Sequence, residues 1–345
     1  MRLFNLFKQE LAIDLGTANT LIIQDNKVVV DEPSIVAINR RTEDTIAVGR
    51  RAMQMHEKTH DEIKTIRPLK DGVIADFRAA EHMIKGMIEM IGAKRQFFTH
   101  LKMVICIPSG ITEVEKRAVF ESAARVDAKE TYLIYEPMAA ALGIGLDVEE
   151  PVGNMIVDIG GGTTEIAVIA LSGIVCDQSI RVAGDEFTDL IVNYMRRQHN
   201  ILIGERTAEQ IKIHIGSALT ELDDPPEPYS VNGRDLLNGI PRQITVSYEE
   251  IAGALDEAIT AIEEAVIRAL ETTPPELASD IYSTGLYLTG GGAMLRGLDL
   301  RLSRKTQLPV HVAEDPLTAV VRGTSKALSD TRRFKSILVP SSSVS

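Results

Sequence analysis

The segment DLGTANT occupies residues 14–20, and the segment DIGGGTT occupies residues 158–164. Each follows one apolar strand-like run and precedes another, so each predicts a turn between two strands. Glycines let the backbone turn tightly and bring its N–H groups up to an anion, while an aspartate at a strand end can hold a hydrated divalent cation. One copy alone is equally compatible with a glycine-rich hairpin turn. Two copies predict a pair of phosphate clamps that face each other and grip one nucleoside triphosphate.

The residues around both turns repeat the same plan, which indicates an internal duplication. The predicted strands are 11–14, 21–24 and 27–30 in the first copy, and 155–158, 165–171 and 174–182 in the second. Elsewhere strand-like and helical patterns alternate, which predicts an α/β fold with a mixed or parallel sheet. A helix is expected at 207–218 after a capping box, and the pairs Asn232-Gly233 and Asn238-Gly239 predict hairpin turns.

Composition limits the class of protein. The chain has 345 residues, of which 44% are hydrophobic, enough for two cores. Its net charge of -12 argues against binding nucleic acid, which requires a basic face. Cys106 and Cys176 lie in apolar runs and predict buried free thiols in a reducing cytoplasm. The chain shows no run of 18 apolar residues and no signal-peptide cleavage site, so no membrane span is expected.

Two further features point to nucleotide chemistry. Gly290, Gly291 and Gly292 follow a predicted strand and are expected to open a helix, whose free N–H groups would contact a nucleotide; the alternative is a tight turn. Glu136 ends another predicted strand and is the acid best placed to orient an attacking water; the alternative is a surface residue that caps the next helix. The chain has no P-loop, no dinucleotide fingerprint and no ligand-spaced histidines, so backbone amides and magnesium must neutralise the phosphates.

Two apolar segments are candidates for contact with a membrane. Leu3, Phe4 and Phe7 recur at helical spacing near the N-terminus, where the alternative is a frayed start that packs on the body. Phe97 and Phe98 lie in a basic loop, where the alternative is packing beneath that loop.

The chain resembles the actin, Hsp70 and sugar-kinase superfamily at four places. These are the two clamps, the segment YEPMAAA at 135–141 and the segment TGGG at 289–292. Within this superfamily the chain resembles the MreB family of bacterial actins, almost from end to end. The long segment IRPLKDGVIADF at 66–77 and the segments at 108–112, 183–185 and 315–317 extend that likeness. The resemblance implies an actin-like (ribonuclease H-like) duplicated fold. Its four subdomains would be IA (1–32, 75–148 and part of 316–345), IB (33–74), IIA (149–184 and 249–315) and IIB (185–248).

The resemblance also assigns roles to residues. Asp14 and Asp158 would hold Mg²⁺, largely through water, and Glu136 with Thr163 would place the hydrolytic water. ATP would be held by the backbone and side chains of both clamps and by a ribose and adenine site. These binding residues are Gly16, Thr17, Ala18, Asn19, Gly160, Gly161, Gly162, Thr163, Glu209, Lys212, Gly290, Gly291, Gly292 and Met294. Without the family, Glu209 and Lys212 read equally as an exposed ion pair. Tyr135 departs from the family, which more often has a second acid there.

The function implied by the resemblance is that of a slow Mg-dependent ATPase whose filaments organise cell-wall synthesis and rod shape. Its partners would be further copies in head-to-tail protofilaments and antiparallel pairs, an anionic membrane surface, and RodZ with other cell-elongation proteins. It would be cytoplasmic and peripheral at the inner face of the plasma membrane. Helix 113–125, with Val114, would pair the protofilaments.

Two other functions within the superfamily compete with this one. A small-molecule kinase would need a sugar or acid pocket with an Asp as base, and the inserts show no such polar group of residues. An Hsp70-like chaperone would need a substrate-binding domain beyond the point where the sequence stops.

Overall fold

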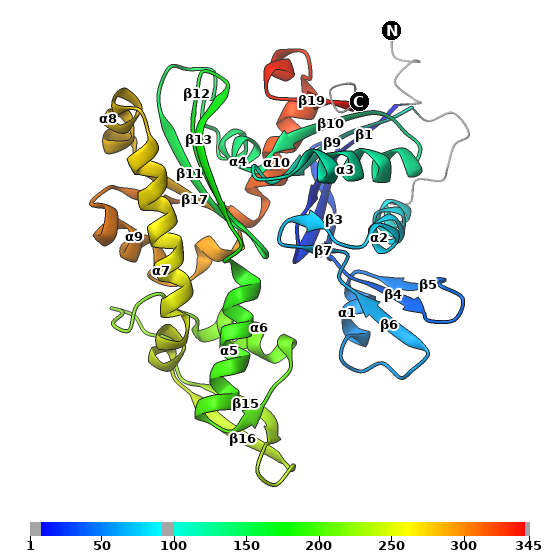
Figure 1. Ribbon diagram of the computed structural model, residues 1–345, viewed down its shortest axis with the longest axis vertical. Coiled ribbons are helices and arrows are strands. Elements are labelled where there is room, and N and C mark those ends of the chain that lie inside the picture. The colour runs from blue at the N-terminus through cyan, green and yellow to red at the C-terminus, as the bar shows by residue number, and fades with distance from the viewer. Residues whose placement is uncertain (1–7, 92–99, 342–345) are drawn as a thin grey trace.

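The computed structural model describes residues 8–91 and 100–341. It has two halves, each built on one large sheet (Figure 1). The first sheet contains β1 (Lys8–Leu15), β2 (Asn19–Gln24), β3 (Lys27–Pro33), β9 (His100–Ile107), β10 (Ala128–Tyr135) and β19 (Val339–Pro340). The second contains β11 (Asn154–Ile159), β12 (Thr164–Ala170), β13 (Gly173–Ile180), β17 (Leu286–Thr289) and β18 (Val310–Val312).

The two large sheets share one topology, which confirms the predicted duplication. The order β3-β2-β1-β9-β10 in the first sheet matches β13-β12-β11-β17-β18 in the second. In both, the first three strands pair antiparallel as a meander and the last two add in parallel. Asp14 pairs with Leu21, and Asp158 pairs with Glu165 at the equivalent register. The two aspartates therefore hold the same position in each half.

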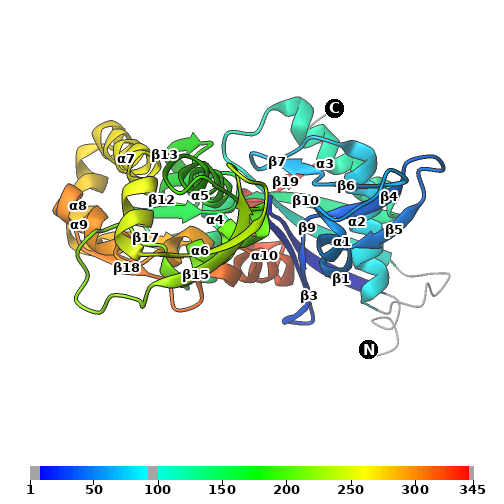
Figure 2. The same ribbon diagram turned by 90° about the horizontal axis from the view of Figure 1, so that it is seen from below.

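Helices cover the sheets and fill the space between them. The helices are α1 (Arg50–Met55), α2 (Phe77–Met90), α3 (Glu113–Arg125), α4 (Glu136–Gly143), α5 (Gly184–Gln198), α6 (Glu205–Ile215), α7 (Tyr248–Thr272), α8 (Pro275–Thr284), α9 (Leu298–Thr306) and α10 (Ala319–Ser329). Short 3-10 turns are η2 (Gly291–Met294), η3 (Pro316–Thr318) and η4 (Arg333–Ser336). Helices α2 and α3 share a core with the outer face of the first sheet, and α5 and α7 share one with the second. The third core joins α4 and α10 to the facing sides of both sheets (Figure 2).

Small sheets extend each half. One contains β4 (Val36–Asn39), β5 (Thr45–Val48) and β6 (Ile63–Ile66), another β14 (Ile201–Leu202), β15 (Tyr229–Asp235) and β16 (Pro241–Val246), and β7 (Leu69–Lys70) pairs with β8 (Val73–Ile74). They lie within the segments 33–74 and 185–248, whose boundaries as subdomains stay predictions.

Three local predictions were wrong. Asn232-Gly233 lies inside β15, where it pairs with β16, and a Cβ on Gly233 would come within 2.7 Å of the Leu202 carbonyl oxygen of β14. Helix α6 begins at Glu205 with Gly204 at its N-cap, so the capping box at Thr207 does not form. The three glycines lead into the short 3-10 turn η2 rather than an α-helix.

The closest packing in the fold is between α4 and α10. A Cβ on Gly323 would lie 1.7 Å from the Ala139 carbonyl oxygen, and a Cβ on Gly143 would lie 1.8 Å from that of Ala319. These distances are shorter than any real contact, so only glycine lets the two helices touch backbone to backbone.

We therefore expect Gly323→Ala to lower the free energy of unfolding by about 3 kcal/mol, because the helices must separate to admit the methyl group. Gly253→Ala is the matched control, since it also lies within a helix but its Cβ would meet nothing within 4 Å. It should stabilise the protein by up to about 1 kcal/mol. Urea unfolding followed by circular dichroism measures both, and equal effects would contradict this account.

Candidate functional site

The two glycine turns meet at the junction between the halves. A Cβ on Gly161 would lie 2.7 Å from the Cβ of Ala18, and one on Gly162 would lie 2.6 Å from Thr17 Oγ1. The second turn thus packs directly on the first, as two facing clamps require. Their glycines keep the backbone of each turn accessible to the other and to any anion bound between them.

Each clamp aspartate is fixed by one donor from a neighbouring strand. Thr289 Oγ1 donates to Asp158 Oδ1 at 2.7 Å, and Cys106 Sγ donates to Asp14 Oδ1 at 3.0 Å. Burial raises the pKa of Asp14 to about 6 and that of Asp158 to about 7, and the negative charge of Asp14 adds to the second shift. The two carboxylates are close enough to repel each other, which a bound cation would relieve.

Two glutamates complete an acidic group. Glu136 is the first residue of α4, and burial, followed by the charges of Glu165, Asp14 and Asp158, raises its pKa well above the usual range. Its side chain is half-buried, and α4 has no side-chain hydrogen bond at its N-cap, Tyr135, so Glu136 does not cap this helix.

Glu165 was missed by the sequence analysis. Its side chain is fully buried on β12, where Ser109 donates to Oε2 from its backbone N (3.1 Å) and its Oγ (2.6 Å). Ser179 Oγ donates to Oε1 at 2.6 Å. Ser109 follows β9 in the first half and Ser179 lies in the second, so Glu165 joins the two halves. Its signal was a single charged residue in the strand TEIAVIA, where only apolar residues follow it.

The donor set suits hydrated magnesium. Within residues 8–91 and 100–341, no group of three or more His, Cys, Asp or Glu side chains is arranged to hold a metal ion. Mg²⁺ commonly keeps several waters and uses one or two carboxylates together with substrate phosphates. Asp14 and Asp158 fit that pattern, because they repel each other across the junction where the two clamps meet.

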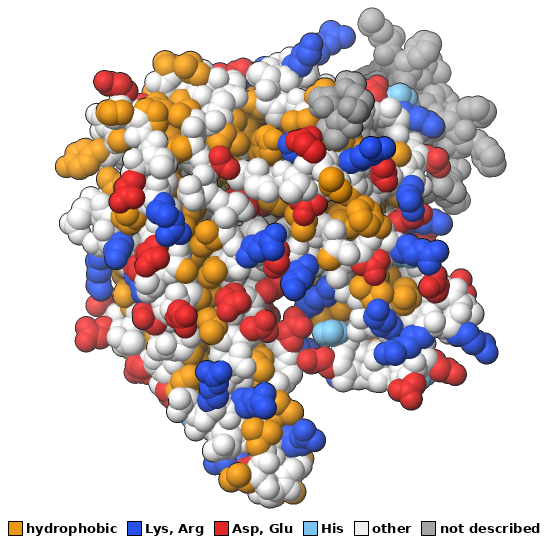
Figure 3. Space-filling view, viewed as in Figure 1, with side chains coloured by type: hydrophobic (Ala, Val, Ile, Leu, Met, Phe, Trp, Pro, Cys, Tyr) orange, Lys and Arg blue, Asp and Glu red, His pale blue; other side chains and the backbone are white. Residues whose placement is uncertain are grey.

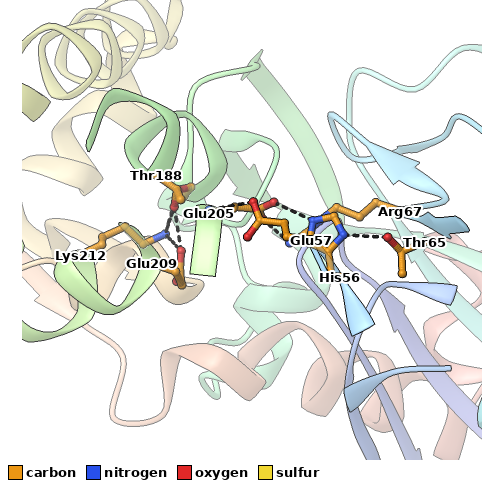
Figure 4. A network of polar contacts seen from close by, with 9 residues as sticks. His56, Glu57, Thr65, Arg67, Thr188, Glu205, Glu209 and Lys212 are labelled. Atoms are coloured by element: carbon orange, nitrogen blue, oxygen red, sulfur yellow. Dashed lines mark hydrogen bonds and ion pairs between the residues drawn. The ribbon is translucent and has the colours of Figure 1, made fainter. Parts of the chain in front are cut away.

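Lys212 lies beside the second clamp. Its Nζ donates to the Gly184 carbonyl oxygen at 2.8 Å and to Thr188 Oγ1 at 3.1 Å, and pairs with Glu209 at 2.7 Å (Figure 4). The ion pair exists, but the Lys212 side chain is only 16% exposed. Its charge is therefore held next to a glycine turn rather than in solvent.

The segments that carry the small sheets contact each other across the junction through residues outside the strands. Arg67, just after β6, pairs with Glu205, the first residue of α6 (Figure 4). His56 Nε2 lies 3.4 Å from the same carboxylate, and Glu57 accepts from the Glu205 backbone N at 3.2 Å. In the described part of the chain, Arg67 Nε is the buried side-chain nitrogen or oxygen without a hydrogen-bond partner. These contacts link the first half to the second.

The turn between β7 and β8 covers the clamps. Its Gly72 N donates to Thr17 Oγ1 at 2.9 Å, and Asp71 pairs with Arg181 of the second half at 3.6 Å. A Cβ on Gly72 would also lie 3.2 Å from Thr163 Cγ2, so Thr163 is packed beneath this turn.

Of the remaining predicted binding residues, two glycines lie against the second clamp, and two side chains are exposed. Gly290, with φ +79°, and Gly292 pack on Ile159 at the end of β11, which explains why side chains are excluded there. Met294 is 58% exposed, and Asn19 is exposed at the start of β2.

The predicted membrane residues Leu3, Phe4, Phe7, Phe97 and Phe98 lie outside the described residues. Lys8 and His100, the first described residues after those segments, are register partners in β1 and β9. Both segments therefore join the body at neighbouring points. Of the helices in the described ranges, none has the length and apolar character needed to cross a bilayer.

Comparison with known proteins gives a consistent result. The model of the MreB/Mbl protein family matches residues 8–336. Cell shape-determining protein MreB of Escherichia coli K12 is 50% identical to this chain over 328 residues, which cover 94% of each protein. Cell shape-determining protein Mbl of Bacillus subtilis 168 is 45% identical over 326 residues, which cover 94% of this chain and 97% of Mbl. The structure of MreB5 of Spiroplasma citri bound to AMPPNP has a TM-score of 0.87 at 38% identity, covering 94% and 97%. A MamK double helical filament shows the same actin-like fold, with a TM-score of 0.78 at 22% identity. The match covers 93% of this chain and 99% of the MamK chain.

The pKa of Asp158 rises from 3.8 to about 7 on folding. Between about pH 4 and pH 7, the folded protein therefore keeps a proton on Asp158 that the unfolded chain has lost. The stability of the metal-free protein should therefore fall as pH rises towards 7. Asp158→Asn removes this charge, so in EDTA at pH 8 it should stabilise by on the order of 2 kcal/mol, less at pH 5. Urea unfolding measures it. The exposed Asp177→Asn should change little at either pH, and destabilisation by Asp158→Asn at pH 8 would contradict the burial argument.

Proposed function

The chain belongs to the MreB/Mbl protein family, and we propose that it is a polymerising, ATP-hydrolysing cytoskeletal protein that determines cell shape. The observation that carries this proposal is the pair of facing clamps, each with an aspartate at the same register of a duplicated sheet. Homologues with 38% identity bind AMPPNP and ADP, which supports ATP as the nucleotide here.

The site supports a hydrolytic role for its acids. A magnesium ion, held by Asp14 and Asp158 largely through water, would neutralise phosphate charge and orient the phosphates. Glu136 has a raised pKa because it is buried beside Glu165 and both aspartates, and such a carboxylate is a suitable acceptor for the proton of an attacking water. Thr163, beneath the Gly72 turn, lies at the clamp on the second half, where its hydroxyl would help to place that water.

The exposed apolar side chains support head-to-tail assembly. Leu237 and Ile240, 84% and 58% exposed, lie at the turn between β15 and β16, at the lower end of the second half (Figure 1). Tyr282 of α8, 72% exposed, and Leu171, 66% exposed, lie at its upper end, and hydrophobic side chains are visible at both ends in Figure 3. Contact between different surfaces of identical subunits builds a filament when its repeated rotation does not close into a ring, and surfaces at opposite ends of a subunit suit such an open arrangement.

Other surfaces are proposed to contact the membrane and to pair the protofilaments. Two apolar segments contain Phe4, Phe7, Phe97 and Phe98, and the strands that follow them begin side by side. Both segments would therefore bind the same lipid surface. Val114, 77% exposed on α3, is the proposed contact between antiparallel protofilaments. The filament would lie at the inner face of the plasma membrane and direct cell-wall synthesis with RodZ and other elongation proteins.

The assembly proposal predicts paired filaments lying flat on an anionic lipid monolayer in electron micrographs of protein with ATP and magnesium. Changing Phe4, Phe7, Phe97 and Phe98 to Ser should remove filaments from lipid but leave them in solution, because the apolar contact with lipid is lost. Leu237→Asp should prevent filaments in both settings, since a charge would be buried at the longitudinal contact. Dispersed particles of the unaltered protein in every nucleotide state would overturn the proposal.

The hydrolysis proposal predicts that Glu136→Gln lowers the rate of phosphate release by about 100-fold while AMPPNP affinity stays within about twofold. Glu165→Gln removes the charge that contributes most, after burial, to the raised pKa of Glu136. Because Glu136 then loses its proton at lower pH, the acid limb of the pH–rate profile should move to lower pH. An unmoved acid limb with a normal rate would show that Glu136 is not the titrating base.

A further inference from the structure

The hydrogen bonds to the two clamp aspartates form an equivalent pair. In one half the thiol of Cys106 donates to Asp14, and in the other the hydroxyl of Thr289 donates to Asp158. In the described part of the chain, these are the hydrogen bonds that fix the two carboxylates, and both use Oδ1.

The strand register shows that the likeness follows from the fold. Asp158 on β11 is the register partner of Thr289 on the parallel strand β17. In the first half Ile13 on β1 is the partner of Ile105 on β9, so the next pair along the two strands is Asp14 and Cys106. Since β9 and β17 occupy the same place in the duplicated sheets, Cys106 and Thr289 are equivalent positions with different chemistry.

The two donors share the property that the site needs. Each is neutral, so each fixes the direction of a carboxylate without cancelling the charge that a cation would bind. Each occupies Oδ1 and leaves Oδ2 for water or a cation. Gly290 supports this arrangement in the second half, because a Cβ there would lie 2.9 Å from Asp158 Oδ1. Cys106 is buried, and its strand β9 lies between β1 and β10 in the sheet.

We propose that Cys106 and Thr289 are paired positioning residues, which orient Asp14 and Asp158 so that the two carboxylates jointly hold the hydrated magnesium of bound ATP. This inference rests on the proposed nucleotide function. It assigns to Cys106 a role in metal affinity rather than in packing alone. Outer-sphere partners of this kind typically change metal affinity by about 10- to 100-fold when removed.

The test measures AMPPNP binding to the full chain by fluorescence competition, once with MgCl₂ and once with EDTA. Cys106→Ala and Thr289→Val, which lose the donor, should each reduce the gain in affinity due to magnesium by on the order of 10-fold. Affinity in EDTA should stay within about twofold. Cys106→Ser and Thr289→Ser, which retain a donor, should restore most of that gain.

Cys176→Ala is the matched control, because Cys176 is the other free cysteine and its thiol contacts Ala269 and Thr273 rather than an aspartate. It should leave both affinities unchanged. Equal loss of affinity with magnesium and with EDTA would assign the residues to packing and overturn the inference, as would an unchanged magnesium gain in Cys106→Ala and Thr289→Val. If the unaltered protein binds AMPPNP equally well in both conditions, the magnesium site fails, and with it this part of the proposed function.

Discussion

The backbone contact between α4 and α10 is the constraint on which the site depends. The chain passes from the first sheet to the second through α4 and returns through α10, so these helices connect the halves. Gly143 and Gly323 bring them together without side chains between them, and both helices share one core with the facing sides of the two sheets. Packed helices that lack intervening side chains have little freedom to slide, because any shift brings backbone atoms into collision. The crossing of α4 and α10 therefore sets how the two halves are placed relative to each other.

Repulsion among buried carboxylates at the junction opposes folding, and a bound cation would reduce it. Asp14, Glu136, Asp158 and Glu165 are near enough for their charges to act on one another, and burial raises the pKa of the first three. Hydrogen bonds from Cys106 and Thr289 stabilise the aspartates only in part. Such a group of acids lowers stability when nothing is bound, and it is typical of sites where function is maintained at the expense of stability. Magnesium and nucleotide would bind the folded protein alone and so stabilise it by mass action.

The sequence was sufficient to predict the duplicated strands, the turn glycines and the positions of both aspartates, because these are local patterns that occur twice. It did not reveal what lies beside them. Glu165 is bound by Ser109 and Ser179, 56 and 14 residues away, and no spacing rule connects the three. Cys106 was correctly predicted as a buried free thiol, yet its bond to Asp14 depends on which strands are neighbours. Asn232-Gly233 was predicted as a turn from its composition, but the packing of β14 on β15 places it within a strand.

Glu165 is bound by both halves and also raises the pKa of Glu136, the proposed base. Its carboxylate is held by Ser109 from the first half and Ser179 from the second, and its charge raises the pKa of Glu136. Glu136 itself begins α4, the helix at the crossing. Because Glu165 is held from both halves, a change in the placement of the halves would alter the separation of the two glutamates, and with it the pKa of Glu136. The ion pair between Arg67, just after β6, and Glu205, the first residue of α6, links the same two halves. A subunit whose halves are held together by neighbours in a filament would thus keep Glu136 in its more basic state, so assembly and hydrolysis would be coupled through one pair of carboxylates.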